Sequence, residues 1–212
     1  MPGVEVRLPG GAWSVVSPNE VEKLLQDSID FICHYDMIET PPDRMQILDF
    51  AIPAFLEAIP KFGKLLESMN GVAPHPTVED ALAGVASALQ ALPTAVDIWD
   101  WPDTAGNRSA LRQAFSSCRY YSYGPALMTK MLHLKRRRLI IPIDTRLRRA
   151  WTVTPGGELD GMVDITFAIG SELRRRRGSL RQLRKTADGM GWPYNNLSTL
   201  RLYDIVSWWK CA

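Results

Sequence analysis

Residues 124–149 limit the possible folds of this chain more than any other segment. Gly124 and the proline after it precede an apolar stretch with helical periodicity at 125–135, and proline is favoured at the first position of a helix. A basic cluster ends this stretch, and Pro142 then comes shortly before Asp144, an acidic residue of the kind that begins helices. The segment therefore predicts a helix, a basic connection and a second helix that starts at position 144 or 145.

The rest of the chain also has mostly helical periodicity. Ser17, Pro18 and Glu20 have the form of a capping box, in which a hydroxyl accepts a hydrogen bond from a backbone N–H and proline starts the helix. Strand signals are short and confined to three segments, 4–8, 13–16 and 139–143. We predict an all-α protein, with further helices or helical turns near 18–32, 44–59, 60–70, 77–92, 107–118, 161–176, 179–189 and 196–209.

Length and composition exclude several classes of protein. The 212 residues are enough for one domain with a full core. No apolar run approaches the roughly 18 residues that span a bilayer, so we expect no membrane partner. The three cysteines are odd in number and far apart, which suits a reducing cytoplasm and excludes a four-cysteine iron–sulfur site. Because His34, His75 and His133 have no metal-ligand spacing, we expect no metal site. We also expect no other cofactor.

The charges are distributed unevenly along the chain. Residues 1–100 hold 5 basic against 15 acidic side chains, a net charge of −10, whereas residues 101–212 hold 20 against 8, a net charge of +12. A basic half of this size favours a polyanion such as DNA or RNA, because binding releases condensed counterions. The alternative is that the two halves neutralise each other inside the protein.

The helix at 125–135, the basic connection and Asp144 together resemble the core of the helix-hairpin-helix DNA glycosylases, the endonuclease III-like superfamily. In that family a hairpin of two helices leads to a Pro/Val-x-Asp-Thr segment, and the separation of 20 positions between Gly124 and Asp144 fits this layout. The resemblance implies one all-α, helix-hairpin-helix domain, 1–212, with two helical lobes around a cleft. The approximate lobes would be 1–76 with 161–212, and 77–160.

The resemblance also implies that Asp144 is catalytic. Hydrolysis of an N-glycosidic bond builds positive charge on the sugar, and a carboxylate stabilises that charge and can orient the attacking water. The alternative is that Asp144 only caps its helix, and the two roles are compatible. Ala126 stands where bifunctional members have a lysine, and Lys130, one turn later, is the nearest lysine. Because alanine cannot form an imine, we expect a monofunctional glycosylase without lyase activity.

The same resemblance implies a DNA-binding surface. The family's Gly-rich turn binds a phosphate through backbone N–H groups, and here it corresponds to Tyr121, Ser122, Tyr123 and Gly124. Ser122 replaces the first glycine, and the tyrosines could stack on bases or pack between helices instead. The expected basic contacts to DNA are Lys130, Lys135, Arg136, Arg137, Arg138 and Arg146.

A wider resemblance, from about residue 48 to 208, is to a bacterial family of unknown function. Our leading hypothesis is a cytoplasmic, nucleoid-associated protein for base excision repair. It would bind double- or single-stranded DNA, flip a modified or damaged base and hydrolyse its N-glycosidic bond. The alternatives are a non-catalytic DNA- or RNA-binding protein on the same scaffold and a protein-interaction module. The sequence indicates neither the base nor the oligomeric state.

Overall fold

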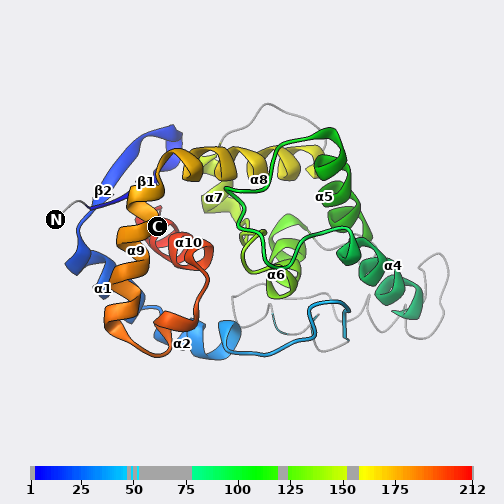
Figure 1. The fold of residues 1–212 in the computed structure, drawn as a ribbon, viewed down its shortest axis with the longest axis horizontal. Helices are drawn as coiled ribbons and strands as arrows, with labels where there is room; N and C mark the ends of the chain where they lie inside the picture. The colour runs from blue at the N-terminus through cyan, green and yellow to red at the C-terminus, as the bar shows by residue number, and fades with distance from the viewer. Residues whose placement is uncertain are drawn as a thin grey trace.

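A computed structural model describes residues 3–46, 49, 52, 78–118, 124–151 and 158–211 of the chain. Over these residues the structure is mostly helical (Figure 1), which confirms the all-α class. The helices are α1 (Pro18–Gln26), α2 (Ile29–Phe31), α4 (Val78–Gln90), α5 (Ala105–Ser117), α6 (Pro125–Lys135), α7 (Thr145–Ala150), α8 (Glu158–Arg175), α9 (Arg177–Met190) and α10 (Thr199–Lys210), with short helical turns η1 (Pro9–Gly11), η2 (Ile32–Asp36) and η6 (Tyr194–Asn196).

Some of the predicted elements cannot be compared with the structure. Most of the helices expected at 44–59 and 60–70, and the hairpin turn at 120–123, lie outside the described residues. Within the described ranges, no helix combines the length and the apolar character needed to cross a membrane. The same ranges contain no group of three or more His, Cys, Asp or Glu residues that could hold a metal ion.

Local capping decides where the helices begin. Ser17 Oγ accepts a hydrogen bond of 3.3 Å from the backbone N–H three residues later, as the capping box predicts for α1. The helix expected near 107–118 begins at Ala105 instead, because the cap of α5 is Thr104, whose Oγ1 accepts from Asn107 N at 3.2 Å. The Asn107 side chain instead donates to Pro102 O at 2.8 Å, so this helix starts earlier than predicted.

Two of the three strand signals form a hairpin. β1 (Val4–Arg7) pairs antiparallel with β2 (Trp13–Val16), and Val4 lies opposite Val16. The third signal, 139–143, is not a strand, although Ile140, Ile141 and Ile143 are fully buried. Its backbone N–H groups bond elsewhere: Ile140 N donates to Arg136 O, and Ile143 N donates to Thr129 Oγ1 at 2.8 Å. The apolar run therefore forms a buried connection between α6 and α7.

The long helix α8 links two hydrophobic clusters. In Figure 1, β1, β2, α1, α9 and α10 lie toward the left of the molecule and α4 and α5 toward the right, with α8 running between the two sides. The first cluster contains side chains of β1, β2, α1, α9 and α10, together with residues 141–151 and the later part of α8. The second contains side chains of α4, α5 and α6 and the earlier part of α8. The predicted lobe boundaries stay a prediction, but the packing joins residues 141–151 to the first cluster.

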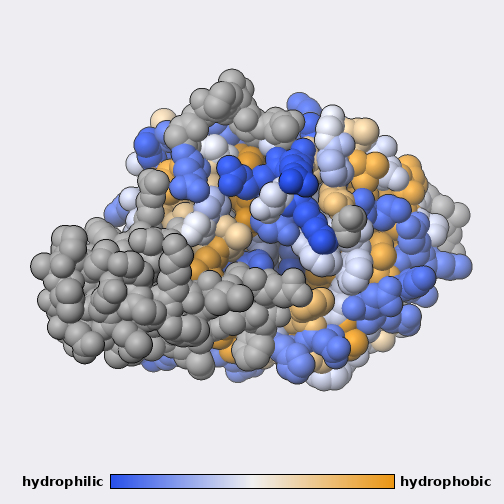
Figure 2. Space-filling view, turned by 180° about the vertical axis from the view of Figure 1, so that it is seen from behind, coloured by the Kyte–Doolittle hydropathy of each residue, from blue (hydrophilic) through white to orange (hydrophobic). Residues whose placement is uncertain are grey.

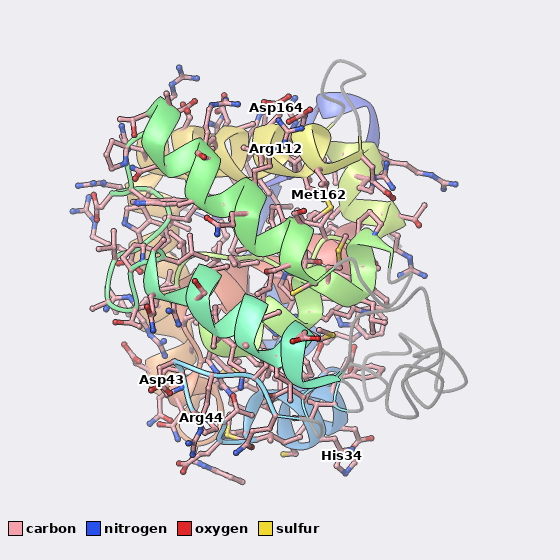
Figure 3. The ribbon with its side chains drawn as sticks, turned by 90° about the vertical axis from the view of Figure 1, so that its right-hand side faces the viewer. His34, Asp43, Arg44, Arg112, Met162 and Asp164 are labelled. Carbon is pink, nitrogen blue, oxygen red and sulfur yellow. The ribbon has the colours of Figure 1, made fainter. Side chains whose placement is uncertain are left out.

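Helix α8 is fixed to its neighbours by ion pairs and by a close backbone approach. Arg108 contacts Asp164 at 2.7 Å, and Arg112 contacts Asp160 at 2.9 Å, which ties α5 to α8. Figure 3 labels one residue of each pair, Asp164 and Arg112. Further along α8, a Cβ added to Gly170 would lie 2.8 Å from Ile98 O. A larger residue would push the helix away from the backbone at position 98.

We therefore expect Gly170→Ala to destabilise the protein by about 1–3 kcal/mol, because the added methyl group meets rigid backbone. Gly161→Ala is the matched control, since it lies in the same helix with no other heavy atom within 4 Å of the added Cβ. The control should be neutral or stabilising, by up to about 1 kcal/mol. Urea unfolding of both variants measures the difference, and equal stabilities would contradict the proposed tight contact.

Candidate functional site

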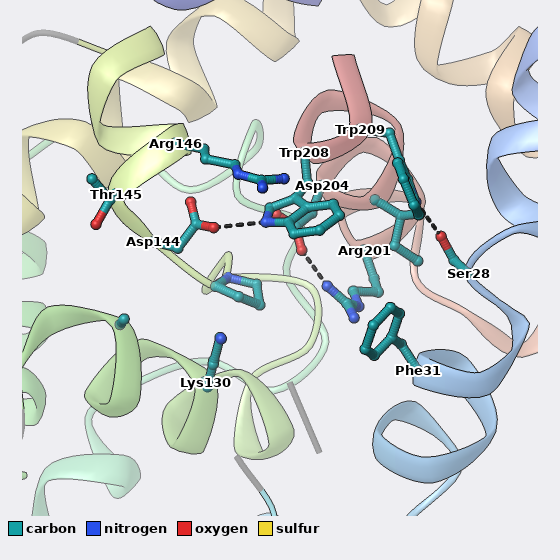
Figure 4. A pocket seen from close by; sticks show the side chains of 13 residues that line it. Ser28, Phe31, Lys130, Asp144, Thr145, Arg146, Arg201, Asp204, Trp208 and Trp209 are labelled. Atoms are coloured by element: carbon teal, nitrogen blue, oxygen red, sulfur yellow. Dashed lines mark hydrogen bonds and ion pairs between the residues drawn. The ribbon is translucent and has the colours of Figure 1, made fainter. Parts of the chain in front are cut away.

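A pocket of about 330 Å³ opens between α6, the start of α7, α10 and the junction of α1 with α2 (Figure 4). This volume lies at the small end of the range of roughly 300–1,000 Å³ typical of ligand pockets. The pocket is lined by Ser28, Phe31, Ala126, Lys130, Pro142, Asp144, Thr145, Arg146, Arg201, Asp204, Ile205, Trp208 and Trp209. It therefore brings together Asp144, Ala126, Lys130 and Arg146, which the sequence had singled out.

Asp144 is held by a hydrogen bond at each carboxylate oxygen. Its Oδ1 accepts from Leu147 N at 2.8 Å and so caps α7, as expected for an acidic residue at this position. Its Oδ2 accepts from Trp208 Nε1 at 2.7 Å, and this bond is drawn in Figure 4. The carboxylate thus caps a helix and lines the pocket at the same time. A carboxylate has about four lone-pair directions, so two donors do not exhaust its capacity to accept hydrogen bonds.

Aromatic rings form one wall of the pocket. The Arg146 guanidinium lies 4.2 Å from the centre of the Trp208 ring, within the range of a cation–π contact. Trp208 meets Trp209 edge to face, with ring centres 5.2 Å apart. Trp209 Nε1 donates to Ser28 Oγ at 2.6 Å, which fixes the second ring against the α1–α2 junction. The choice of Trp208 and Trp209 for this wall depends on the packing of α10 against α7, which the sequence does not give.

Ala126 and Lys130 face the pocket from α6, one helical turn apart, as their spacing predicts. The turn η2 supports this part of α6, because Tyr35 Oη donates to Lys130 O at 2.5 Å. His133 is buried one turn further on and its Nδ1 lies 2.5 Å from Ile140 O. Burial lowers the pKa of His133 well below its ordinary value, so the ring is neutral near pH 7. His133 is therefore a buried structural residue that joins α6 to the connection after it.

A buried ion cluster forms part of the pocket lining, and the sequence did not indicate it. Arg201 Nε lies 2.9 Å from Asp36 Oδ1 and 3.0 Å from Oδ2, and Arg201 Nη1 donates to Asp204 Oδ2. Burial raises the pKa of Asp204 to about 7, against the opposing effect of Arg201. Burial also raises the pKa of Asp36, again opposed by Arg201. For Arg201 itself burial works to lower the pKa, but Asp36 and Asp204 raise it above its ordinary value.

Two residues of the predicted DNA path are buried instead. Lys135 Nζ lies 2.6 Å from Asp49 Oδ2, and both side chains are inaccessible to solvent. Arg136 is also buried and donates to backbone carbonyls of segments far away in the sequence, including Leu92 O at 2.9 Å and Pro42 O at 2.5 Å. The expectation that Lys135 and Arg136 contact DNA is therefore corrected, because both side chains are used inside the protein.

Arg137 and Arg138 also have partners within the protein. Arg137 donates to the backbone carbonyls of Asp36 and Ile38, the latter at 2.6 Å. Arg138 binds both oxygens of Asp97, at 2.8 and 2.7 Å, and its side chain stays about half exposed. Neither residue lines the pocket, so the structure does not bring them together with Asp144.

Several ion pairs join the acidic half of the chain to the basic half. Within the described residues they are Lys135–Asp49, Arg138–Asp97, Arg176–Glu5, Arg177–Asp100, Arg201–Asp36 and Lys210–Glu20. The structure therefore supports internal neutralisation for part of the charge, which was the alternative to a polyanionic partner.

Other arginines remain exposed near the pocket. Arg148 and Arg149 are exposed on α7, close to the pocket-lining residues Thr145 and Arg146. Figure 2 shows the most hydrophilic residues gathered near the middle of one face of the molecule. Of the turn expected to bind phosphate, the structure describes only Gly124, which is exposed and precedes α6, whereas Tyr121, Ser122 and Tyr123 lie outside the described residues.

A protein-family model matches residues 65–211, more than half of the chain. The chain belongs to a family of unknown function, DUF6308. The part of the chain that matches DUF6308 includes Asp144, Arg201, Asp204 and both pocket tryptophans, whereas Ser28 and Phe31 come from outside it. Searches of curated proteins and of solved structures gave no significant match.

The buried pair Lys135–Asp49 should contribute more to stability than the half-exposed pair Arg138–Asp97. Lys135→Met leaves the Asp49 carboxylate buried without its counter-charge, so the free energy of unfolding should fall by about 3–5 kcal/mol. Arg138→Met removes a half-exposed partner of Asp97 and should cost about 1 kcal/mol or less. Urea unfolding measures both losses. A small loss for Lys135→Met would contradict its assignment to the interior.

Proposed function

We propose that this protein is a DNA glycosylase-like enzyme that binds DNA, accepts a modified or damaged base in the pocket and hydrolyses its N-glycosidic bond. The observation that carries the proposal is the position of Asp144, a doubly hydrogen-bonded carboxylate beside an aromatic wall in a small pocket. A charged side chain that is held in one orientation inside a small pocket is typical of reactive sites.

The chemistry needs a carboxylate with a fixed orientation. As the bond between sugar and base breaks, positive charge develops on the sugar ring, and a nearby anion stabilises it. Asp144 is held before any ligand arrives, by Leu147 N and Trp208 Nε1, so little reorganisation is required during the reaction. The remaining lone pairs of Asp144 can also accept a proton from the attacking water.

The pocket walls suit a flat heterocycle. An enzyme that acts on a base in DNA must take it out of the stack, and the extruded base is held by stacking and by polar contacts at its edge. Phe31, Trp208 and Trp209 provide aromatic surface, and Arg201 and Asp204 provide polar groups in the same pocket. Ala126 lines the pocket. By the resemblance to the helix-hairpin-helix glycosylases it corresponds to the imine-forming lysine of bifunctional members, and alanine cannot form an imine, which favours hydrolysis without lyase activity.

The exposed arginines of α7 supply a surface for the DNA backbone. Arg148 and Arg149 lie beside the pocket, and within the described residues neither takes part in an ion pair. Guanidinium groups match phosphate geometry well, and contacts of this kind position DNA without reading its sequence. We therefore expect DNA affinity to fall steeply with salt concentration.

The decisive variant is Asp144→Asn. Asparagine also caps helices, so the variant should fold, but it cannot take a proton or stabilise a cation as a carboxylate does. Release of base should slow by about 10²–10⁴-fold while DNA affinity is unchanged. The assay uses duplex and single-stranded oligonucleotides with a panel of modified bases, followed by alkaline cleavage of abasic sites. Asp188→Asn, on an exposed part of α9, is the matched control and should keep full activity.

A second candidate is a non-catalytic DNA- or RNA-binding protein, and the capping role of Asp144 favours it, because a cap alone explains this residue. In that case the panel would show no abasic product with any substrate, while salt-sensitive binding to nucleic acid would remain. Base release that is equal in Asp144→Asn and in the unchanged protein would overturn the catalytic role.

A further inference from the structure

The pocket contains a second carboxyl group, Asp204, which belongs to a cluster with unbalanced charge. The buried guanidinium of Arg201 lies between two carboxyl groups, those of Asp36 and Asp204. All three side chains are at least nine-tenths buried. If both carboxyl groups were ionised, the cluster would carry a net negative charge in a medium of low polarity. Such clusters retain a proton on one member.

The geometry decides which carboxyl group keeps the proton. Asp36 receives Arg201 Nε at both oxygens, at 2.9 and 3.0 Å, and Arg137 donates to its backbone carbonyl, so a second guanidinium is close. Asp204 Oδ2 accepts a hydrogen bond from Arg201 Nη1. The negative charge of Asp144 in the same pocket disfavours ionisation of Asp204. Asp36 is therefore better compensated, and the proton stays on Asp204.

The charged and titratable groups around Asp204 come from several elements. They are Arg201 from α10, Asp36 and Tyr35 from η2, Lys130 and His133 from α6, Arg137 from the connection after α6, Asp144 at the start of α7, and Arg146 from α7. His133 is neutral and Tyr35 keeps its proton, because burial lowers the pKa of the histidine and raises that of the tyrosine. Burial raises the pKa of Asp204 to about 7, in agreement with the charge balance.

Asp204 also reaches the pocket. It is one of the lining residues, and only 4 % of it is exposed. Trp208 lines the same pocket, and Figure 4 shows the Asp204 side chain with its ion pair to Arg201. A base stacked on this wall would therefore have an acid on one side and the Asp144 carboxylate elsewhere in the pocket. Two carboxyl groups with different protonation states are a common arrangement for paired acid and base roles.

We propose that Asp204 is a second catalytic residue, which delivers a proton to the leaving base. This inference rests on the proposed glycosylase function. In the step, the bond between C1′ and the base nitrogen breaks and its electron pair goes to the base, which takes the proton of Asp204. Water adds its oxygen to C1′ and gives a proton to the Asp144 carboxylate. The products are the free base and an abasic sugar with a C1′ hydroxyl, and proton exchange with solvent restores both aspartates.

The test combines Asp204→Asn with a pH profile of base release. Asparagine has the shape of the protonated acid, so the cluster should keep its contacts, but it has no proton to give. We expect single-turnover base release to slow by about 10²-fold or more. The unchanged protein should lose activity as pH rises through about 7, and Asp204→Asn should lose this alkaline decline. Asp204→Glu, which restores an acid, should recover part of the rate, and Asp188→Asn should match the unchanged protein.

A direct titration separates the two proposals. Carbon-13 NMR of the aspartate carboxyl groups, with the Asp204 signal assigned by its loss in Asp204→Asn, should give a midpoint near pH 7. A midpoint near the ordinary value of about 4 would overturn the inference. So would an unchanged rate and pH profile in Asp204→Asn while Asp144→Asn is inactive, and the glycosylase function would then stand. Absence of base release by the unchanged protein would overturn the function itself, and the catalytic role of Asp204 with it.

Discussion

The buried guanidinium of Arg201 is the group on which the pocket depends. It donates to both oxygens of Asp36 and to Asp204, and so connects η2 with α10 across 165 positions of sequence. Charges in the interior are tolerated only when they are paired and hydrogen-bonded, so removal of the guanidinium would leave two carboxyl groups without compensation. Because Arg201 and Asp204 also line the pocket, the contacts that hold α10 against η2 also give the pocket its polar side.

Asp144 also has both a structural role and a place in the pocket. One oxygen caps α7, the other accepts from Trp208 of α10, and the two elements are 64 positions apart at this bond. Trp208 is in turn covered by Arg146 and packed against Trp209. The orientation of the carboxylate is thus set by the packing of two helices before any ligand binds. A preorganised charge of this kind is what stabilisation of a developing cation requires.

The sequence predicted features that depend on neighbouring residues, such as the cap of α7 at Asp144, because capping is a local interaction. The sequence did not predict contacts between side chains and partners that are far away along the chain. Lys135 and Arg136 look like part of a basic surface, but they bind Asp49 and carbonyls 44 or more positions away. Arg201 and Asp204 were missed as well, although two charged residues within the apolar run 200–206 are a recognisable signal of a buried ion pair.

Stabilisation of a cation on the sugar by Asp144 can be tested without knowing the base. The measurement is the affinity for two duplexes that differ at one abasic-site analogue, either a cationic pyrrolidine or a neutral tetrahydrofuran. A mimic of the charged transition state should bind about 10²-fold or more tightly than its neutral counterpart. If the Asp144 carboxylate stabilises the cation, this preference disappears in Asp144→Asn. Equal affinity for both duplexes, or a preference that survives in Asp144→Asn, would contradict it.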